Sequence, residues 1–276
     1  MVPIGDSCAT RWPILLVHGV AFKQAERLRY WGRIPATLRA QGAQVFISNQ
    51  DAWGTYISNA QQLCSMVVQI LEEQKVEKVN IIAHSKGGVD ARLLAALPDM
   101  SGRIASITTV ASPHHGLRNL NWVSHTPRVF KWLASFPLDI SLILIGDDNP
   151  NVVSVFEDLS QSSMEELNKR YPVPDGVFLQ SFSVVQRNAL TDPFFSFTMP
   201  LNRLIEGDND GLVSRSSAAF GEYKGEVNET GTYGISHINI VNRSLLPNSR
   251  DGLNRDGFNI LSWWVELVSD LKDRGF

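Results

Sequence analysis

An unbroken apolar run at residues 13–17 stops abruptly at His18 and Gly19, and it constrains the fold more than any other feature. A strand that is apolar at every position is buried on both faces, as in a parallel sheet covered by helices on its two sides. The glycine that follows allows the backbone to turn sharply where the strand ends. The sequence therefore predicts a chain organised around a buried parallel sheet.

Strand-like and helical patterns alternate along most of the chain. Strands are predicted at residues 44–48, 78–83, 103–111 and 177–185, and amphipathic helices at residues 56–74, 87–97 and 259–272. This βαβ rhythm predicts an α/β fold with a mostly parallel central sheet and helices on both faces. A chain of 276 residues can form such a fold as a single domain, which we expect to cover residues 1–276.

Residues 117–163 interrupt this rhythm. The segment contains many large apolar residues but no regular strand and turn pattern. We interpret it as short amphipathic helices inserted between strands of the core. The alternative is a packed helical cap with no interfacial role.

Composition and charge exclude several classes of protein. Hydrophobic residues make up 43% of the chain and charged residues 19%, which is typical of a globular protein with a large core. The formal net charge of -3 gives no basic surface for nucleic acid. No apolar run of about 18 residues predicts a membrane-spanning helix. No signal peptide pattern is visible, so the expected location is either the cytoplasm or outside the cell after signal removal.

The two cysteines, Cys8 and Cys64, are far apart in the sequence. A single pair of this kind does not form a disulfide framework, and neither C-x-x-C nor zinc spacing is present. We therefore expect two reduced thiols.

Residues 83–88 form the most informative motif, because they join a buried strand directly to a helix. Ser85 has small residues two positions away on either side, Ala83 and Gly87. A sharp strand–turn–helix junction needs such small residues, and it raises the serine side chain above the sheet. The helix N-terminus then points free N–H groups at the reacting centre. This context indicates a nucleophilic serine rather than an ordinary helix cap.

A serine nucleophile needs a base, and the chain offers six histidines: His18, His84, His114, His115, His125 and His237. In folds with this turn the chain order is serine, acid, histidine. His237 lies late in the sequence and leaves room for an acid before it. It is therefore the favoured base.

The acid is expected in the turn-forming run at residues 206–213, where Asp208 and Asp210 compete. Asp210 is favoured as the residue that orients His237 and stabilises its charged form. The alternatives are a solvated turn carboxylate or a local calcium loop. The loop would need a bidentate glutamate further along the chain, which residues 220–222 do not convincingly supply.

Two backbone N–H groups are needed to stabilise a developing oxyanion. One is the N–H of Lys86, directly after the nucleophile. The other is expected in the loop after the first strand, where Val20 follows Gly19. His18 is interpreted as a residue that braces this loop.

Four motifs in order, at residues 14–19, 79–88, 111–116 and 209–214, together resemble the bacterial triacylglycerol lipases. The chain is similar to the Pseudomonas and Burkholderia lipases and resembles their relatives from clostridia and other Firmicutes more closely. The resemblance implies an α/β-hydrolase fold and the catalytic residues Ser85, Asp210 and His237. It also implies oxyanion donors at Val20 and Lys86, and a lid formed by the segment after Gly116.

The chain departs from the resemblance at two places. Pseudomonas-type relatives bind a structural calcium ion through an aspartate two residues after the histidine, where this chain has Asn239. Those relatives also contain a disulfide near the acid and the histidine, whereas both cysteines here lie far upstream. We therefore expect no cofactor and no metal ion.

The expected activity is hydrolysis of carboxylic esters with lipid-like acyl groups, through an acyl-enzyme on Ser85. Contact with lipid interfaces would be transient. An acyltransferase or thioesterase would use the same residues, and a catalytically inactive hydrolase fold that binds lipid is the alternative from another class.

Overall fold

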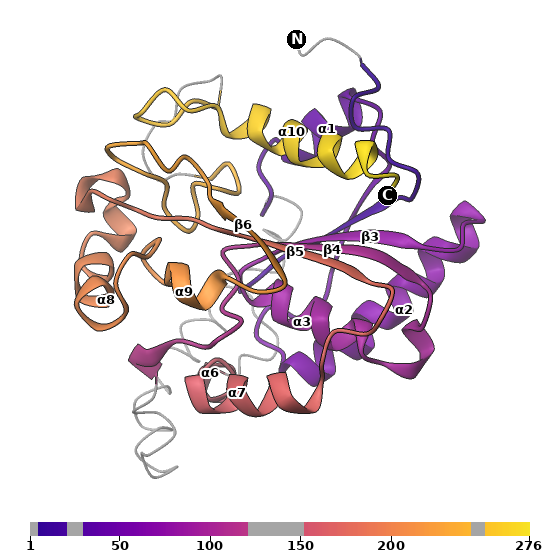
Figure 1. The fold of residues 1–276 in the computed structure, drawn as a ribbon, viewed down its shortest axis with the longest axis horizontal. Helices are drawn as coiled ribbons and strands as arrows, with labels where there is room; N and C mark the ends of the chain where they lie inside the picture. Colours follow the sequence, from indigo (N-terminus) through magenta and orange to yellow (C-terminus); the bar gives the residue numbers. More distant parts are fainter. Residues whose placement is uncertain (1–4, 21–29, 121–151, 244–251) are drawn as a thin grey trace, which may run out of the picture.

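The computed structural model describes residues 5–20, 30–120, 152–243 and 252–276, and Figure 1 shows its central sheet between layers of helices. Six strands form one sheet in the order β2-β1-β3-β4-β5-β6, and every neighbouring pair is parallel. The strands are β1 (Ile14–Val17), β2 (Val45–Ile47), β3 (Val79–His84), β4 (Ile104–Val110), β5 (Phe178–Ser183) and β6 (Glu222–Glu226). The predicted α/β class and parallel sheet are confirmed.

The helices cover both faces of this sheet, as predicted (Figure 1). On one face α2 (Tyr56–Gln74) packs beside α3 (Lys86–Ala95), and on the other α1 (Ile34–Ala40) packs beside α10 (Ile260–Asp273). The remaining α-helices in the described ranges are α6 (Val152–Asp158), α7 (Gln161–Arg170), α8 (Thr198–Glu206) and α9 (Arg215–Ala218). Short 3₁₀ helices occur at Pro98–Met100, Arg118–Leu120, Ala189–Thr191 and Pro193–Phe195.

The strand β1 shows why a continuous apolar run is needed. Ile14 and Leu16 contribute to the cluster that includes α1 and α10, whereas Leu15 and Val17 contribute to the cluster that includes α2 and α3. All four side chains are fully buried. Because successive side chains of a strand point to opposite faces, a sheet covered on both sides needs apolar residues at every position.

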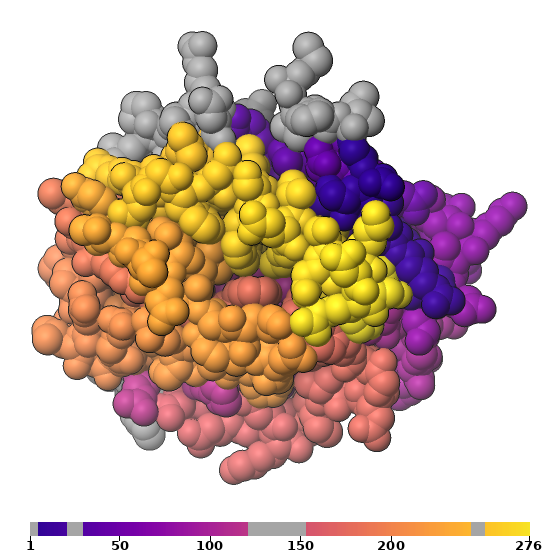
Figure 2. All heavy atoms as spheres, turned by 45° about the horizontal axis from the view of Figure 1, so that its top comes forward, coloured from indigo at the N-terminus to yellow at the C-terminus, as the bar shows by residue number. Residues whose placement is uncertain are grey.

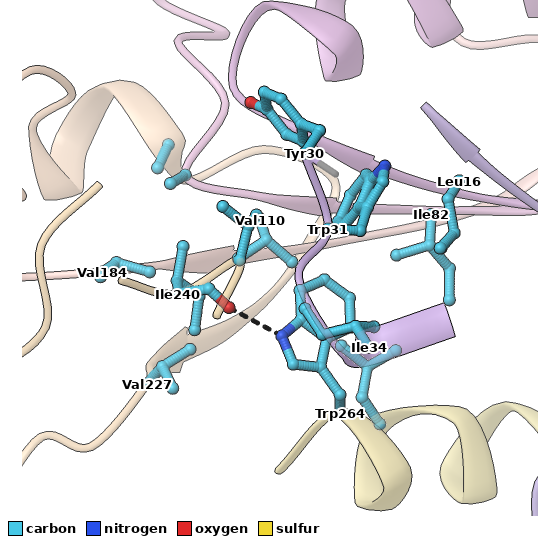
Figure 3. Close-up of a cluster of buried hydrophobic side chains, with 14 of the residues drawn as sticks. Leu16, Tyr30, Trp31, Ile34, Ile82, Val110, Val184, Val227, Ile240 and Trp264 are labelled. Atoms are coloured by element: carbon cyan, nitrogen blue, oxygen red, sulfur yellow. Dashed lines mark hydrogen bonds between the residues drawn. The ribbon is translucent and has the colours of Figure 1, made fainter. Parts of the chain in front are cut away.

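A pair of tryptophans anchors the C-terminal helix to the rest of the core (Figure 3). The rings of Trp31 and Trp264 meet edge to face with their centroids 5.6 Å apart. The indole Nε1 of Trp264 donates a hydrogen bond of 2.8 Å to the carbonyl oxygen of Ile240, drawn as the dashed line in Figure 3. This bond ties α10 to the segment that follows His237.

The C-terminal helix also lies beside the first described residues of the chain. Figure 2 shows the first described residues, in indigo, beside the C-terminal segment, in yellow, on one face of the molecule. The N–H of Arg11 donates to the carbonyl oxygen of Phe276 at 2.7 Å, and Lys272 Nζ donates to the carbonyl oxygen of Asp6 at 2.7 Å.

The inserted segment predicted at residues 117–163 falls mostly outside the described residues. Its described parts are the 3₁₀ helix Arg118–Leu120, helix α6 and the start of α7, which continues to Arg170. Both cysteines are free thiols, as expected. Within the described ranges, no helix combines the length and the apolar character needed to cross a membrane.

Candidate active site

Ser85 occupies the sharp turn between β3 and α3. Its backbone lies in a left-handed region, with φ 57° and ψ −136°, a conformation that costs of order 1–3 kcal/mol for a residue with a side chain. A Cβ added to Gly87 would lie 2.5 Å from the carbonyl oxygen of His18. The glycine therefore lets the first turn of α3 pack directly against the end of β1, as the turn motif requires.

The structure brings Ser85, His237 and Asp210 into one hydrogen-bonded chain. Ser85 Oγ and His237 Nε2 are 2.8 Å apart, and His237 Nδ1 is 2.6 Å from Asp210 Oδ2. The other carboxylate oxygen of Asp210 accepts backbone N–H bonds from Leu212 at 3.0 Å and Val213 at 2.8 Å. With Asp210 ionised, His237 carries its proton on Nδ1 and presents an unprotonated Nε2 to the serine hydroxyl.

The structure separates the two competing carboxylates. Asp210 is fully buried, and its carbonyl oxygen also accepts the backbone N–H of His237 at 2.9 Å. Asp208 is 38% exposed and forms ion pairs with Arg203 at 3.3 Å and Arg215 at 3.2 Å. Asp210 is therefore the carboxylate that contacts the histidine.

The other described histidines are held by different partners. His114 is buried, with Nε2 2.9 Å from Thr109 Oγ1 and Nδ1 3.1 Å from Arg92. His115 Nε2 lies 3.1 Å from the carbonyl oxygen of Ala219. His125 lies outside the described residues.

Val20 and Lys86, the predicted oxyanion donors, follow β1 and β3, which are neighbours in the sheet. The carboxyl ends of neighbouring parallel strands meet at one edge, where ligands of open α/β sheets bind. A Cβ on Gly19 would lie 2.7 Å from Ser85 Cβ. The segment that carries Val20 therefore runs directly beside the serine.

Two aromatic residues that the sequence analysis did not assign to the site lie next to these groups. The ring of His84 is 4.6 Å from the ring of His237, and Tyr30 Oη is 2.6 Å from His84 Nδ1. Burial raises the pKa of Tyr30, so its hydroxyl remains protonated and donates to His84. Burial and the neighbouring charge of His237 lower the pKa of His84 well below its ordinary value. A neutral His84 does not oppose a positive charge on His237.

A buried ionic cluster lies beside the start of α3. Lys86 Nζ contacts both carboxylate oxygens of Asp90, at 2.9 and 3.0 Å.

Burial raises the pKa of Asp158, at the end of α6, to about 6. A hydrogen bond from the backbone of Tyr56 and the charge of Lys86 oppose this rise, whereas the charges of Asp90 and Glu157 add to it.

Replacement of Asp158 by asparagine should stabilise the protein at pH 8 and leave its stability almost unchanged at pH 4. The pKa of Asp158 is higher in the folded state than in the unfolded chain. Below the pKa of the unfolded chain the Asp158 carboxyl is neutral in both states and does not lower the stability of the fold. As the pH rises through about 6, the carboxyl must be charged in its buried position, and stability is lost. Solvent screening at this partly exposed group reduces the expected gain at pH 8 to about 1 kcal/mol. Urea unfolding at both pH values measures it, and equal effects at both would contradict this account.

The position two residues after His237 carries an amide side chain rather than a carboxylate. Asn239, at the position where Pseudomonas-type relatives have an aspartate, is buried and offers an uncharged amide oxygen. Within the described ranges, no group of three or more histidine, cysteine, aspartate or glutamate side chains is arranged to hold a metal ion. Calcium prefers several oxygen ligands that include carboxylates.

Several known proteins are similar to this chain in sequence or in structure. A family model described as a PGAP1-like alpha/beta domain matches residues 52–139. A triacylglycerol lipase from Pseudarthrobacter phenanthrenivorans is 37% identical over 160 residues, which cover 56% of this chain and 46% of the relative. The chain therefore spans about half the length of that relative. A triacylglycerol lipase from Pseudomonas fragi is 26% identical over 98% of this chain and 99% of its own length.

A solved structure of a metagenomic carboxyl esterase superposes with a TM-score of 0.75 at 16% identity, covering 99% of this chain and 79% of that one. The sheet, its covering helices and this likeness define an α/β-hydrolase fold. Within that class, the chain is similar in sequence to bacterial triacylglycerol lipases, which confirms the resemblance indicated by its motifs.

Proposed function

We propose that this protein hydrolyses carboxylic esters with lipid-like acyl groups through an acyl-enzyme on Ser85. The hydrogen-bonded chain from Ser85 Oγ through His237 to Asp210, with links of 2.8 and 2.6 Å, carries the proposal. A serine becomes an effective nucleophile when an oriented histidine can take its proton. The similarity to proteins named triacylglycerol lipase and carboxyl esterase supports an ester as the substrate.

Ser85 Oγ attacks the ester carbonyl carbon while His237 Nε2 takes the hydroxyl proton. The carbonyl oxygen becomes negatively charged, and the N–H groups of Val20 and Lys86 stabilise it. His237 then donates the proton to the leaving alcohol oxygen as the carbon–oxygen bond breaks. In the second half, water gives a proton to His237 and attacks the acyl carbon. The carboxylic acid leaves, and Ser85 regains its proton.

An apolar surface near the acid loop supports a lipid-like acyl group. Phe195 packs against Gly211, where an added Cβ would lie 2.5 Å from its ring, and the ring centroid is 6.3 Å from that of His237. Large apolar side chains are exposed on the same stretch of chain, namely Leu190, Phe194, Phe197, Leu201, Leu204 and Ile205. Exposed apolar side chains that gather on one surface suit contact with a lipid interface.

The proposal is tested by assaying the purified protein on p-nitrophenyl butyrate and on an emulsion of tributyrin. A phosphonate ester inhibitor should form a covalent bond with Ser85 Oγ and abolish both activities. Mass spectrometry of the inhibited protein locates the phosphorus, and a label on any other residue would contradict the assignment. Absence of hydrolysis with both substrates would overturn the proposed function. Transfer of most acyl groups to an added alcohol, rather than to water, would assign the protein to the acyltransferases instead.

A further inference from the structure

The two proposed oxyanion donors belong to different segments, so something must fix their separation. Val20 follows the end of β1, and Lys86 begins α3. An oxyanion site works because its donors are already in position before the charge develops. Besides the close packing at Gly87, the structure contains a buried polar network that reaches both segments.

The first part of this network holds the backbone of His18, two residues before Val20. The side chain of Gln50 donates from Nε2 to the carbonyl oxygen of His18 at 2.7 Å. The backbone N–H of His18 donates to Ser48 Oγ at 3.3 Å. Gln50 and Ser48 are each 1% exposed. The loop at residues 48–54 therefore forms hydrogen bonds with both the backbone N–H and the carbonyl oxygen of His18.

The second part links the same loop to α3. Asn59 donates from Nδ2 to the carbonyl oxygen of Asp51 at 2.9 Å and to Asp90 Oδ2 at 2.8 Å. Asp90 accepts the ammonium group of Lys86, at 2.9 and 3.0 Å. Asn59, Asp90 and Lys86 are each 1% exposed. The side chain of Lys86 thus anchors the residue whose own N–H is the second donor.

Stability alone does not explain this arrangement. A cation in the first turn of a helix is unfavourably placed in the field of the helix dipole. Replacement of a buried ion pair by apolar residues is often neutral or stabilising, because removing two charges from water is costly. Hydrogen bonds formed in a dry interior, by contrast, restrict the geometry of the groups that they join. The network is therefore better explained by positioning.

We infer that Gln50, Asn59 and the Lys86–Asp90 pair are positioning residues that hold the backbone donors of Val20 and Lys86 in the geometry of the oxyanion. This inference rests on the proposed ester hydrolysis at Ser85. The four side chains act through the backbone and do not touch the substrate. Their loss should weaken transition-state binding and leave substrate binding largely intact.

Gln50→Met tests the first part of the network, with Gln180→Met as its matched control. Both glutamines are buried, and each donates one side-chain hydrogen bond, Gln50 to His18 and Gln180 to Thr108 Oγ1 at 2.9 Å. Gln50→Met should lower kcat for p-nitrophenyl butyrate by about 10- to 100-fold with little change in KM. Gln180→Met should lower the thermal midpoint of unfolding about as much as Gln50→Met does, and it should leave kcat unchanged.

A trifluoromethyl ketone provides a readout that a purely structural role would not change. This inhibitor adds to a serine hydroxyl and places a tetrahedral oxyanion in the site. Its inhibition constant should rise in Gln50→Met by the same factor as kcat/KM falls. The double variant Lys86→Met/Asp90→Leu, which removes both buried charges together, should show the same kinetic pattern and remain folded.

The outcomes separate this inference from the proposed function. If wild-type protein hydrolyses no ester, the proposed function fails and this inference fails with it. If wild-type protein is active and folded Gln50→Met keeps its kcat and inhibitor affinity, only the positioning inference is overturned. If Gln50→Met does not fold, the double variant decides by the same two measurements.

Discussion

Replacement of Ser85 by alanine is expected to lower kcat for p-nitrophenyl butyrate by about 10⁶-fold, the largest effect of any single substitution in this chain. The variant keeps the backbone of the turn but has no hydroxyl to attack the carbonyl carbon. His237 Nε2, now 2.8 Å from Ser85 Oγ, would have no proton to take. The proposed backbone donors, Val20 and Lys86, would remain and leave a small residual rate.

Ser112→Ala is the matched control for this substitution. Ser112 is buried, whereas Ser85 is partly buried, and it lies close to α3, since a Cβ added to Gly88 would contact it. It takes no part in the proposed mechanism, so its loss should leave kcat unchanged. Circular dichroism and thermal unfolding establish that both variants are folded. Residual hydrolysis by Ser85→Ala within about tenfold of wild type would contradict a serine nucleophile at this position.

The central strands of the sheet could be predicted because apolar residues at successive positions indicate a strand that is buried on both faces. β1, β3 and β4 are buried at every position. β1 is wholly apolar, and β3 and β4 contain apolar residues at several positions that are visible without a structure. The predicted helix at residues 56–74 coincides with α2, because its apolar positions recur every three or four residues. These signals are local, so a single sequence contains them.

Among the elements that were not predicted from sequence, three show the physical reason clearly. β6, Glu222–Glu226, is an edge strand with three exposed residues and no apolar alternation. α1, Ile34–Ala40, has only seven residues, too few for a helical period to stand out. α8, Thr198–Glu206, exposes several of its apolar residues, so the usual inference from apolar residue to buried face does not apply to it.

Some residues of the candidate site could be predicted from the sequence, and others could not. Ser85 lies in a short motif, and Asp210 and His237 follow it in the expected order, so all three could be named from sequence. Gln50 and Asn59 lie in an unremarkable loop and an ordinary helix. Their contacts with His18 and Asp90 arise only when segments 31 or 32 positions apart come together. No local pattern distinguishes them from solvated amides.

Replacement of Asp210 by asparagine should lower kcat by about 10⁴-fold while the fold is retained. Oδ1 of the new amide would still accept the N–H groups of Leu212 and Val213, which now lie 3.0 and 2.8 Å from Asp210 Oδ1. Its NH₂ group would then face His237 Nδ1. His237 would accept that bond at Nδ1 and carry its own proton on Nε2. It would thus point a proton at Ser85 and could not act as the base.

Asp208→Asn provides the comparison, because it makes the same chemical change two residues away. Asp208 is 38% exposed and pairs with Arg203 and Arg215 rather than with the histidine. Loss of such surface ion pairs should cost less than about 1 kcal/mol of stability and leave kcat within about twofold of wild type. The kcat values of the two variants on p-nitrophenyl butyrate decide the matter. Equal losses in both variants, or a greater loss in Asp208→Asn, would show that Asp210 does not orient the base.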